Sequence, residues 1–403
     1  MQVKKLPIEF IDGRSVLRKI EENGYEAYFV GGSVRDTLLK LPIHDVDMAT
    51  SAYPSEIKTI FKRTIDTGID HGTVTVLFDN KPFEITTFRT ESGYQDYRRP
   101  DKVTFIRSLK EDLKRRDFTI NAFAMRENGE IIDLFDGRTD LKERKIKAVG
   151  DANLRFNEDA LRMMRAVRFA SQLDFQIEAK TFQAIKDNCQ LIQKIAIERI
   201  NVEFIKMMLG IKPERGLQQM LDTNLFENIP FFNDFLDDLK LLLNKDLMHK
   251  IHNEVQVWTL FSIQFKLDEQ MTKKMMRIFK CSNKLINDVV AATKGCNLIL
   301  QNQLDAFNLY QIGKVNILNA NQSATIYGGQ IKEEKLLNDF NSLPIKEKHE
   351  LEINGGFLIK NGIKPGPKLG KVLKQLEFEV VDGKLLNNQS QLLNRANEIL
   401  ESN

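Results

Sequence analysis

The chain has 403 residues, of which 42% are hydrophobic, and this length and composition predict two to four domains with buried cores. Lys and Arg outnumber Asp and Glu only by 59 to 56, so any nucleic-acid surface must come from local clustering of charge. The 22 glycines and 10 prolines are too few for a fibrous or disordered protein.

Cysteines and apolar runs bear on the compartment in which the protein works. The three cysteines are odd in number and lack metal-ligand spacing, which argues against a disulfide framework and favours a reducing environment. There is no apolar run of about 18 residues, and the N-terminus lacks the apolar core of a signal peptide. We therefore expect a cytoplasmic protein that has no membrane partner.

The pattern of apolar residues changes near residue 150. Before it, short β-rich runs at 27–30, 73–78 and 83–88 alternate with helical runs, which predicts an α/β or α+β domain. After it, helical periodicity continues to the end, with plausible breaks near 210–213 and 301–303. The chain as a whole is thus expected to be α+β, with a mixed sheet first and helices afterwards.

The first segment with chemical character is Gly-Gly-Ser-Val-Arg-Asp at 31–36. Gly31 and Gly32 follow an apolar strand and precede a helical run, so their backbone N–H groups could approach a phosphate closely. Arg35 would add a fork of donors to a triphosphate. The alternative is a tight turn followed by a surface pair, and the segment alone does not decide between the two.

Asp45 and Asp47 come about ten residues later. On a strand, carboxylates at i and i+2 point to the same face and can share hard divalent cations. Such a pair is more often simply exposed to solvent, but the preceding glycines give it the context of a nucleoside triphosphate site. Glu84, in an apolar strand, could supply a third carboxylate or could be an ordinary exposed residue.

A second segment, Arg-Arg-Asp-Phe-Thr-Ile-Asn-Ala at 115–122, places two arginines before a predicted short helix. Asp117 is expected to cap that helix. Arg115 and Arg116 then lie near its positive end, where they are costly unless an anion is bound. An ion pair with Glu111 or Asp112 is the structural alternative.

A third segment, 158–168, has helical periodicity with Ala160, Met163, Met164, Val167 and Ala170 on one face. The opposite face carries a charged band, formed by Asp159, Arg162, Arg165 and Arg168. Such a band is usually solvated. However, Asp and Arg at i and i+3 lie side by side and offer an acceptor beside a donor, which complements cytosine and adenine but not guanine or uracil.

Taken in order, these motifs resemble those of class II tRNA nucleotidyltransferases, in particular the bacterial CCA-adding enzymes of the Gram-positive type. A further match is Glu-Arg-x-x-x-Glu at 198–203, which in the family mainly braces the neck and which also suits an i, i+4 pair of Arg199 and Glu203. The resemblance implies a polymerase-beta-like head followed by helical neck, body and tail. It places these parts at 1–149, 150–210, 211–300 and 301–403.

The resemblance also implies roles for individual residues. Asp45 and Asp47 would be the catalytic carboxylates that hold Mg²⁺. The nucleotide-binding residues would be Gly32, Arg35, Arg116, Asp159, Arg162, Arg165 and Arg168, with the last four selecting CTP and then ATP. Glu84 would be a third carboxylate, and Gly31, Ser33, Asp117 and Asn121 would also belong to the site.

The implied reaction adds or repairs the 3′-terminal CCA of tRNA, through attack of the tRNA 3′-hydroxyl on the nucleotide α-phosphate with release of pyrophosphate. A lysine stripe at 360–374 could follow the tRNA backbone, and only the resemblance points to the tRNA elbow. Poly(A) polymerases, CC-adding enzymes and a catalytically silent RNA-binding protein are the alternatives; the segment 89–100 looks like the loop that CC-adding enzymes lack. Either a monomer or a homodimer is compatible with the sequence.

Overall fold

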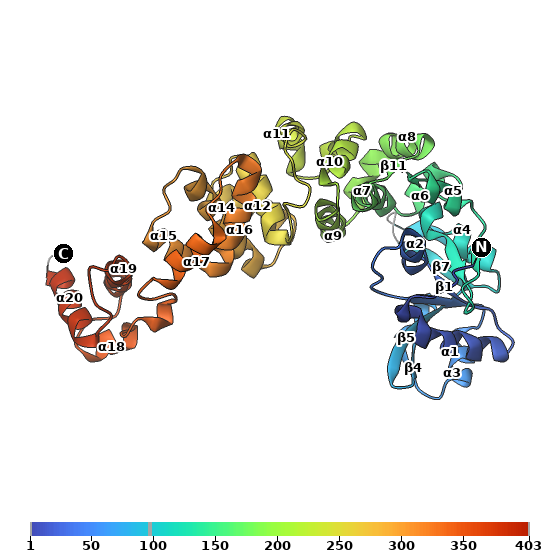
Figure 1. Cartoon of the computed structure of the whole chain (residues 1–403), viewed down its shortest axis with the longest axis horizontal. Helices are drawn as coiled ribbons and strands as arrows, with labels where there is room; N and C mark the ends of the chain where they lie inside the picture. The colour runs from blue at the N-terminus through green and yellow to red at the C-terminus, as the bar shows by residue number, and fades with distance from the viewer. Residues whose placement is uncertain (1, 96–98, 402–403) are drawn as a thin grey trace. The chain divides into compact units, whose positions relative to one another are not determined.

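The computed structural model describes residues 2–95 and 99–401. The chain forms two compact units, Met1–Leu236 and Asp237–Asn403 (Figure 1). The border between them falls at Leu236, whereas the breaks expected near 210–213 and 301–303 are junctions between helices. The division into head, neck, body and tail therefore stays a prediction.

The N-terminal part of the first unit contains a seven-stranded mixed sheet (Figure 1). In spatial order the strands are β3 (Thr64–Gly68), β4 (Thr73–Phe78), β5 (Lys81–Thr87), β2 (Asp47–Thr50), β1 (Ala27–Val30), β8 (Phe123–Met125) and β9 (Ile131–Asp133). Within this sheet β2 and β5 are parallel and the other pairs are antiparallel. The strands expected at 27–30 and 73–78 are confirmed, and the third, expected at 83–88, begins two residues earlier.

One face of the sheet is covered by α1 (Ile8–Glu22), with α3 (Pro54–Ile60) beside it (Figure 1). Phe10 of α1 packs edge-on against Phe29 of β1, with ring centroids 4.8 Å apart. Gly13 allows this close approach, because a Cβ there would lie 2.4 Å from the Met48 side chain. This face is therefore a packed core that has no room for a ligand.

The opposite face carries a second core, which joins Tyr28, Val30 and Ala49 to Leu109 and Leu113 of α4 (Leu109–Lys114). Successive strand residues point to opposite faces, so Asp47 shares this face with Ala49. The helix α2 (Gly32–Leu39) follows β1 directly. Beside this core, β6 (Arg89–Gln95) and β7 (Arg99–Phe105) form an antiparallel ribbon, and residues 96–98 of the expected loop 89–100 lie outside the described residues.

Helices dominate after residue 150, as expected, although a short parallel pair links β10 (Lys145–Ile146) to β11 (Gln176–Ile177). The remaining elements of the first unit are η1 (Ile69–His71), η2 (Thr119–Asn121), α5 (Gly137–Lys142), α6 (Ala152–Glu158), α7 (Leu161–Leu173), α8 (Ala179–Asn188), η3 (Cys189–Lys194), α9 (Ile197–Met208), α10 (Pro213–Asp222), η4 (Phe226–Asn228) and η5 (Phe232–Phe235). The five apolar residues expected on one face of the 158–168 segment are all buried. They pack α7 against the rest of the unit and leave its arginine face toward the site.

The second unit is helical throughout its described residues. Its elements are α11 (Leu236–Leu242), α12 (Glu254–Gln264), α13 (Glu269–Ile278), α14 (Asn283–Leu300), α15 (Ala306–Ile312), α16 (Lys314–Ala324), η6 (Thr325–Tyr327), α17 (Glu333–Asn341), η7 (Lys348–Glu350), α18 (Gly355–Lys360), α19 (Pro367–Val381) and α20 (Gln389–Glu401). Trp258 and Phe279 form part of its core, with ring centroids 4.9 Å apart. Side chains of Asn253, Asp268 and Ser282 accept hydrogen bonds from the first turns of α12, α13 and α14, which fixes where these helices begin.

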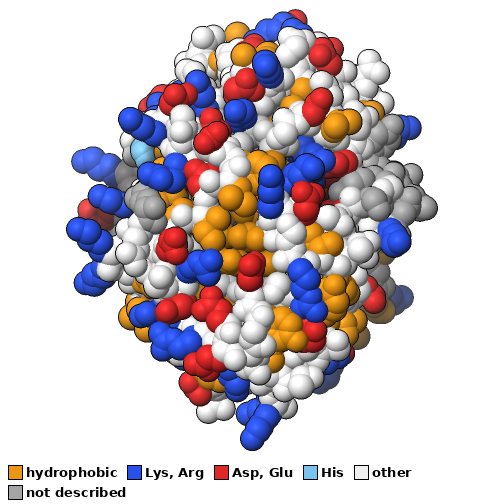
Figure 2. Space-filling model, turned by 90° about the vertical axis from the view of Figure 1, so that its right-hand side faces the viewer, with side chains coloured by type: hydrophobic (Ala, Val, Ile, Leu, Met, Phe, Trp, Pro, Cys, Tyr) orange, Lys and Arg blue, Asp and Glu red, His pale blue; other side chains and the backbone are white. Residues whose placement is uncertain are grey.

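Over the described ranges, no helix is both long enough and apolar enough to cross a membrane. Within the part of the chain that the structure describes, Cys189, Cys281 and Cys296 form no disulfide bond. On the face shown in Figure 2, Lys and Arg are interspersed with Asp and Glu around a central group of hydrophobic side chains. That face therefore offers no field of a single sign.

Gly137, at the start of α5, provides a test of how tightly the sheet-side helices pack. A Cβ there would lie 2.4 Å from the backbone oxygen of Thr119 and 2.7 Å from the ring of Phe123. Because a backbone oxygen cannot move aside cheaply, we expect Gly137→Ala to reduce the free energy of unfolding by roughly 1–3 kcal/mol, the usual cost of overpacking. Urea unfolding measures this loss.

Gly370→Ala is the matched control, because Gly370 lies inside α19 with open space around it. There we expect no loss, or a gain of up to about 1 kcal/mol from better helix propensity. Equal destabilisation by both substitutions would contradict the packing described for α5.

Candidate active site

A cavity of about 400 Å³ in the first unit brings together most of the residues that the sequence singles out. It is lined by Gly31, Gly32, Arg35, Asp47, Arg115, Arg116, Asp117, Asn121, Asp159, Arg162, Arg165, Arg168 and Phe169. Arginines outnumber aspartates in this lining, so the cavity suits an anion. Of the predicted residues, Asp45, Glu84 and Ser33 are not part of the lining.

The turn between β1 and α2 forms one wall of the cavity. Gly31 has a φ of 74°, which favours glycine, and a Cβ there would lie 2.9 Å from Nη1 of Arg116. Its N–H donates to the Phe123 carbonyl at 3.3 Å, so the expectation that both glycines offer free N–H groups is wrong for Gly31. Gly32 begins α2, where first-turn N–H groups have no acceptor within the helix. The Ser33 hydroxyl donates to the Val30 carbonyl at 3.2 Å and so has a structural role.

The acidic residues lie at the start of β2. Asp47 is the first strand residue, but Asp45 precedes the strand, so the expectation that one strand carries both is wrong for Asp45. The parallel register aligns Met48 with Ile85, which brings Glu84 beside Asp47. Loss of solvation raises the pKa of the Asp47 carboxyl; Arg116 opposes this shift, and Glu84 and Asp45 reinforce it. The carboxylates are thus close enough to repel one another.

Arg115 and Arg116 follow α4 and share a buried carboxylate, that of Asp112. Arg115 contacts Asp112 at 2.9 Å, and Arg116 contacts it at 3.5 Å. The ion-pair alternative is therefore confirmed, through Asp112. Burial lowers the pKa of Arg116, and its Nε is buried without a hydrogen-bond partner. Arg116 thus retains donor capacity beside Gly31 and Asp47.

Asp117 joins the two sides of the cavity and is not the cap of the short helix. The residue at the N-cap of η2 is Phe118, and Asp117 accepts hydrogen bonds from the Phe118 N–H, the Asn121 amide and Arg165. Although burial opposes it, the Arg165 charge and these hydrogen bonds lower the pKa of Asp117 to about 2. Asn121 in turn accepts from Arg35 at 2.6 Å. The expected cap is wrong because a long-range ion pair takes the carboxylate.

The helix expected across 158–168 is interrupted. α6 ends at Glu158, and α7 begins at Leu161, with Asp159 in extended conformation between them. Asp159 and Arg162 are therefore not neighbours on one helix face as expected, although both line the cavity. Asp159 accepts from the Leu161 N–H at 3.0 Å, a local bond that competes with helix continuation.

Neighbouring groups fix the charged band of α7, so it is not a solvated face. Arg162 donates to Glu158 at 2.7 Å and to the backbone oxygen of Arg115 at 2.9 Å. Arg168 is buried and meets Glu203 of α9 at 2.8 Å.

The residues of the 198–203 motif also pair between elements. Arg199 contacts Asp159 at 3.3 Å, and Glu203 contacts Arg168. The expected pair of Arg199 with Glu203 is wrong, since each binds a residue outside α9. These contacts brace α9 against α7 and against the Asp159 junction.

Two lining residues were missed as site candidates, Arg115 and Phe169. Phe169 lies four residues after Arg165 and seven after Arg162 on α7, a spacing that places it on the same helix face. That spacing could have identified it. Arg115 was recognised as part of its motif, but Asp112 and Glu91 hold its guanidinium.

Three stretches of the chain match known protein families. Residues 27–147 match the poly A polymerase head domain, residues 174–236 match the probable RNA- and SrmB-binding site of polymerase A, and residues 249–396 match tRNA nucleotidyltransferase domain 2. The head-domain match spans the glycine turn, Asp47 and the 115–122 segment.

Relatives and solved structures agree with these matches. The chain is 53% identical to the CCA-adding enzyme of Ligilactobacillus salivarius, with 100% of this chain and 99% of the relative covered, and 53% identical to that of Pediococcus pentosaceus, with 98% and 99% covered. The crystal structure of the Bacillus stearothermophilus CCA-adding enzyme in complex with CTP superposes with a TM-score of 0.88 at 36% identity, covering 98% of this chain and 99% of that one. The Thermotoga maritima CCA-adding enzyme complexed with tRNA shares the fold, with a TM-score of 0.60 at 21% identity and 99% and 96% covered. With half of its residues identical over the full length, the chain belongs to the CCA-adding enzymes, a family of tRNA nucleotidyltransferases.

Proposed function

We propose that this chain adds or repairs the 3′-terminal CCA of tRNA, with CTP and ATP as substrates. The tRNA 3′-hydroxyl attacks the α-phosphate of the nucleotide, and pyrophosphate leaves. The observation that carries the proposal is the convergence of the glycine turn, Asp47, Arg116 and the arginine face of α7 on one cavity. Membership in the CCA-adding family supports it.

The triphosphate would bind at the Gly32 turn and Arg116. Arg116 is the best-suited donor, because its buried Nε lacks a partner and a bound anion would satisfy it. Arg35 would both brace the site and bind the substrate. Its Nε and Nη2 donate to Asp36 and its Nη1 donates to Asn121, which fixes the guanidinium. About two of its five N–H donors remain for the substrate.

Nucleotidyltransferases of this family depend on a metal ion, and the residues present fit one. Asp45 and Asp47 supply the carboxylate oxygens that Mg²⁺ prefers, and their mutual repulsion with Glu84 is what a cation relieves. No group of three or more His, Cys, Asp or Glu side chains forms a metal site within the described residues, so substrate oxygens or water would complete the ligand set. When bound, Mg²⁺ lowers the pKa of the attacking hydroxyl and stabilises charge on the leaving group. The contribution of Glu84 as a third carboxylate of the metal site stays a prediction.

Base selection would rest on Asp159 and Arg162, which neighbouring groups hold in place. Arg162 donates three hydrogen bonds, to the Glu158 carboxylate and to the backbone oxygens of Arg115 and Arg155. About two of its five N–H donors therefore remain for a base. Asp159 is held by Leu161 and Arg199, and its oxygens keep further acceptor sites. A fixed donor and a fixed acceptor that line the same cavity favour cytosine and adenine, because guanine and uracil would leave buried groups unpaired. Arg165 and Arg168 would complete this wall.

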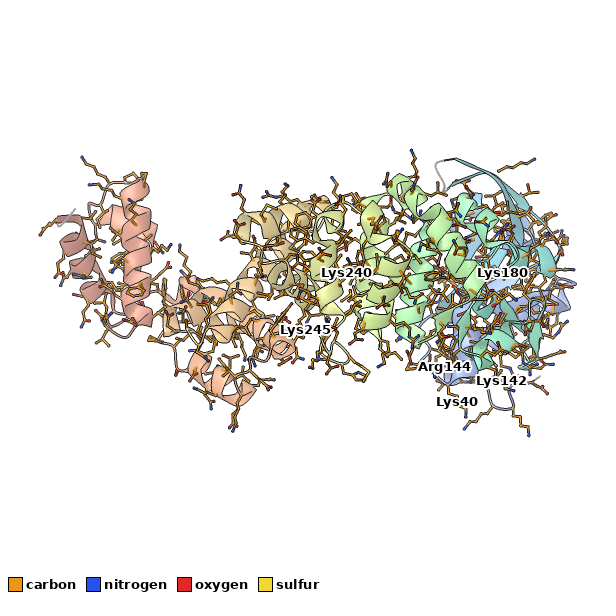
Figure 3. All side chains as sticks on the ribbon, turned by 90° about the horizontal axis from the view of Figure 1, so that it is seen from above. Lys40, Lys142, Arg144, Lys180, Lys240 and Lys245 are labelled. Carbon is orange, nitrogen blue, oxygen red and sulfur yellow. The ribbon has the colours of Figure 1, made fainter. Side chains whose placement is uncertain are left out.

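Binding of the tRNA backbone would use exposed basic side chains outside the cavity. In the second unit, Lys360, Lys364, Lys368, Lys371 and Lys374 are all exposed. In the first unit, Lys40, Lys142 and Arg144 lie along one edge in the view of Figure 3. Such clusters suit a phosphate backbone, which carries no sequence information.

The remaining proposals concern organisation. The four-part division at 1–149, 150–210, 211–300 and 301–403, the contact of the tail with the tRNA elbow and a monomer or homodimer all stay proposals. A reaction on tRNA with CTP and ATP suits the cytoplasm. Poly(A) polymerase activity is the nearest competing function, since residues 27–147 match the poly A polymerase head domain.

Product lengths test the proposal directly. Purified protein is incubated with tRNAs that lack all, one or none of the terminal CCA nucleotides, and CTP, ATP, GTP or UTP is supplied singly or in pairs. We expect CTP to extend tRNAs that lack C, ATP to add a single A after CC, and complete tRNA to remain unchanged. Long A tails would indicate a poly(A) polymerase, a stop after CC would indicate a CC-adding enzyme, and binding without extension would indicate a silent RNA-binding protein.

Arg162→Ala should relax base choice. Loss of its donors removes a charged hydrogen bond of about 1.5–3 kcal/mol from the correct base, so the preference for CTP over UTP should fall roughly 10- to 150-fold. Single-turnover rates with each of the four nucleotides measure this ratio.

Asp47→Asn provides the contrast, because it should abolish transfer with every nucleotide while leaving CTP binding detectable. If Arg162→Ala also lowered all four rates by one common factor, base reading by Arg162 would be ruled out.

Replacing Lys364, Lys368 and Lys371 together by Ala should weaken tRNA binding without changing CTP binding. Each of these lysines that binds a phosphate should contribute about one unit to the slope of log K against log salt, and its removal should reduce the slope by that amount. Filter binding across a salt series measures the slope, and an unchanged slope would exclude these lysines as partners of the backbone.

A further inference from the structure

Phe169 is the one aromatic side chain among the described lining residues of the cavity. It is 3% exposed and lies on α7, one residue after Arg168. Its ring packs edge-on against Phe118, with centroids 5.9 Å apart and an interplanar angle of 85°. Phe118, the residue after Asp117, therefore packs against the ring and supports its position.

Three guanidinium groups surround this ring. The Cζ atoms lie 4.3 Å from the ring centroid for Arg168, 5.0 Å for Arg35 and 5.4 Å for Arg165. All three arginines line the cavity. They come from two separate helices, α2 and α7, and the ring is a contact that all three share.

This arrangement addresses an electrostatic problem. Three like charges in a small, poorly solvated space repel one another. Each arginine has one anionic partner, namely Asp36 for Arg35, Asp117 for Arg165 and Glu203 for Arg168. Burial and the nearby Arg165 charge still lower the pKa of Arg168 to about 10, and its Nε is buried without a hydrogen-bond partner.

The face of an aromatic ring is negative, so it attracts a guanidinium that lies over it. An aliphatic side chain of similar size would fill the same space but would offer no such attraction. We propose that Phe169 is a positioning residue whose ring holds Arg35, Arg165 and Arg168 around the cavity and thereby sets the affinity for CTP and ATP. This inference rests on the proposal that both nucleotides bind in this cavity.

Fluorination of the ring tests the inference, because fluorine atoms weaken the ring's negative face while adding little volume. Phe169 is replaced by mono-, di- and trifluorophenylalanine in the full chain, and binding of CTP and ATP is measured by calorimetry. We expect the dissociation constant of each nucleotide to rise with each fluorine, to a total of roughly three- to tenfold, as for a weakened cation–π contact. Unfolding midpoints should fall only slightly, because the fluorinated ring keeps its packing against Phe118.

Phe156 is the matched control, since it is fully buried in α6 and no described arginine or lysine lies over its ring. The same fluorine series there should leave both dissociation constants unchanged. Ordinary variants add a second readout: Phe169→Tyr keeps the ring and should bind nucleotides nearly as the wild type does, whereas Phe169→Leu should bind them more weakly.

The results of these binding experiments distinguish a failure of the positioning role of Phe169 from a failure of the proposed function. Nucleotide affinity that is insensitive to fluorine at Phe169, or equally sensitive at Phe156, would overturn the positioning role while leaving the proposed reaction in place. A wild-type chain that binds neither CTP nor ATP would overturn both.

Discussion

The site depends on one buried carboxylate, that of Asp117. It lies between α4 and η2, and it binds Arg165 of α7 at 2.7 Å and Asn121 at 3.1 Å. Asn121 in turn accepts a hydrogen bond from Arg35, which lies beside the glycine turn. A buried carboxylate without these partners would be costly, so the walls of the cavity are fixed together through a single group.

The same logic explains how the cavity tolerates its positive charge. Acidic partners stand behind the arginines, outside the cavity: Asp112 binds Arg115, Glu158 binds Arg162, and Glu203 binds Arg168. These pairs use only some of the donors of each guanidinium, and the others remain for an anion. Preorganisation of this kind costs stability in the empty protein and saves reorganisation when an anion binds. Because the arginines are paired locally, the net charge of +3 over the whole chain does not reveal the positive charge of the cavity.

Much of the fold and most of the lining residues could be predicted from the sequence. Short β-rich runs bounded by turn residues located β1 and β4, and helical periodicity identified the buried face of α7. The errors share a cause, which is that local patterns do not record distant partners. The Gly31 N–H is taken by Phe123, and Asp117 is taken by Arg165. The helix break at Asp159 was hidden because the apolar spacing continues across it. Phe169 was not singled out, because its arginine neighbours come from two helices.

The parallel pairing of β2 with β5 has a consequence for assembly. The strand that begins with Asp47 can pair with this neighbour only after β3 and β4 have been synthesised, and the cavity lacks a wall until α7 at 161–173 is present. Contacts between such distant parts of a chain form slowly, because loop closure must precede them. During synthesis, then, the cavity stays incomplete until the chain has emerged from the ribosome past α7, because the arginine face of that helix forms one of its walls.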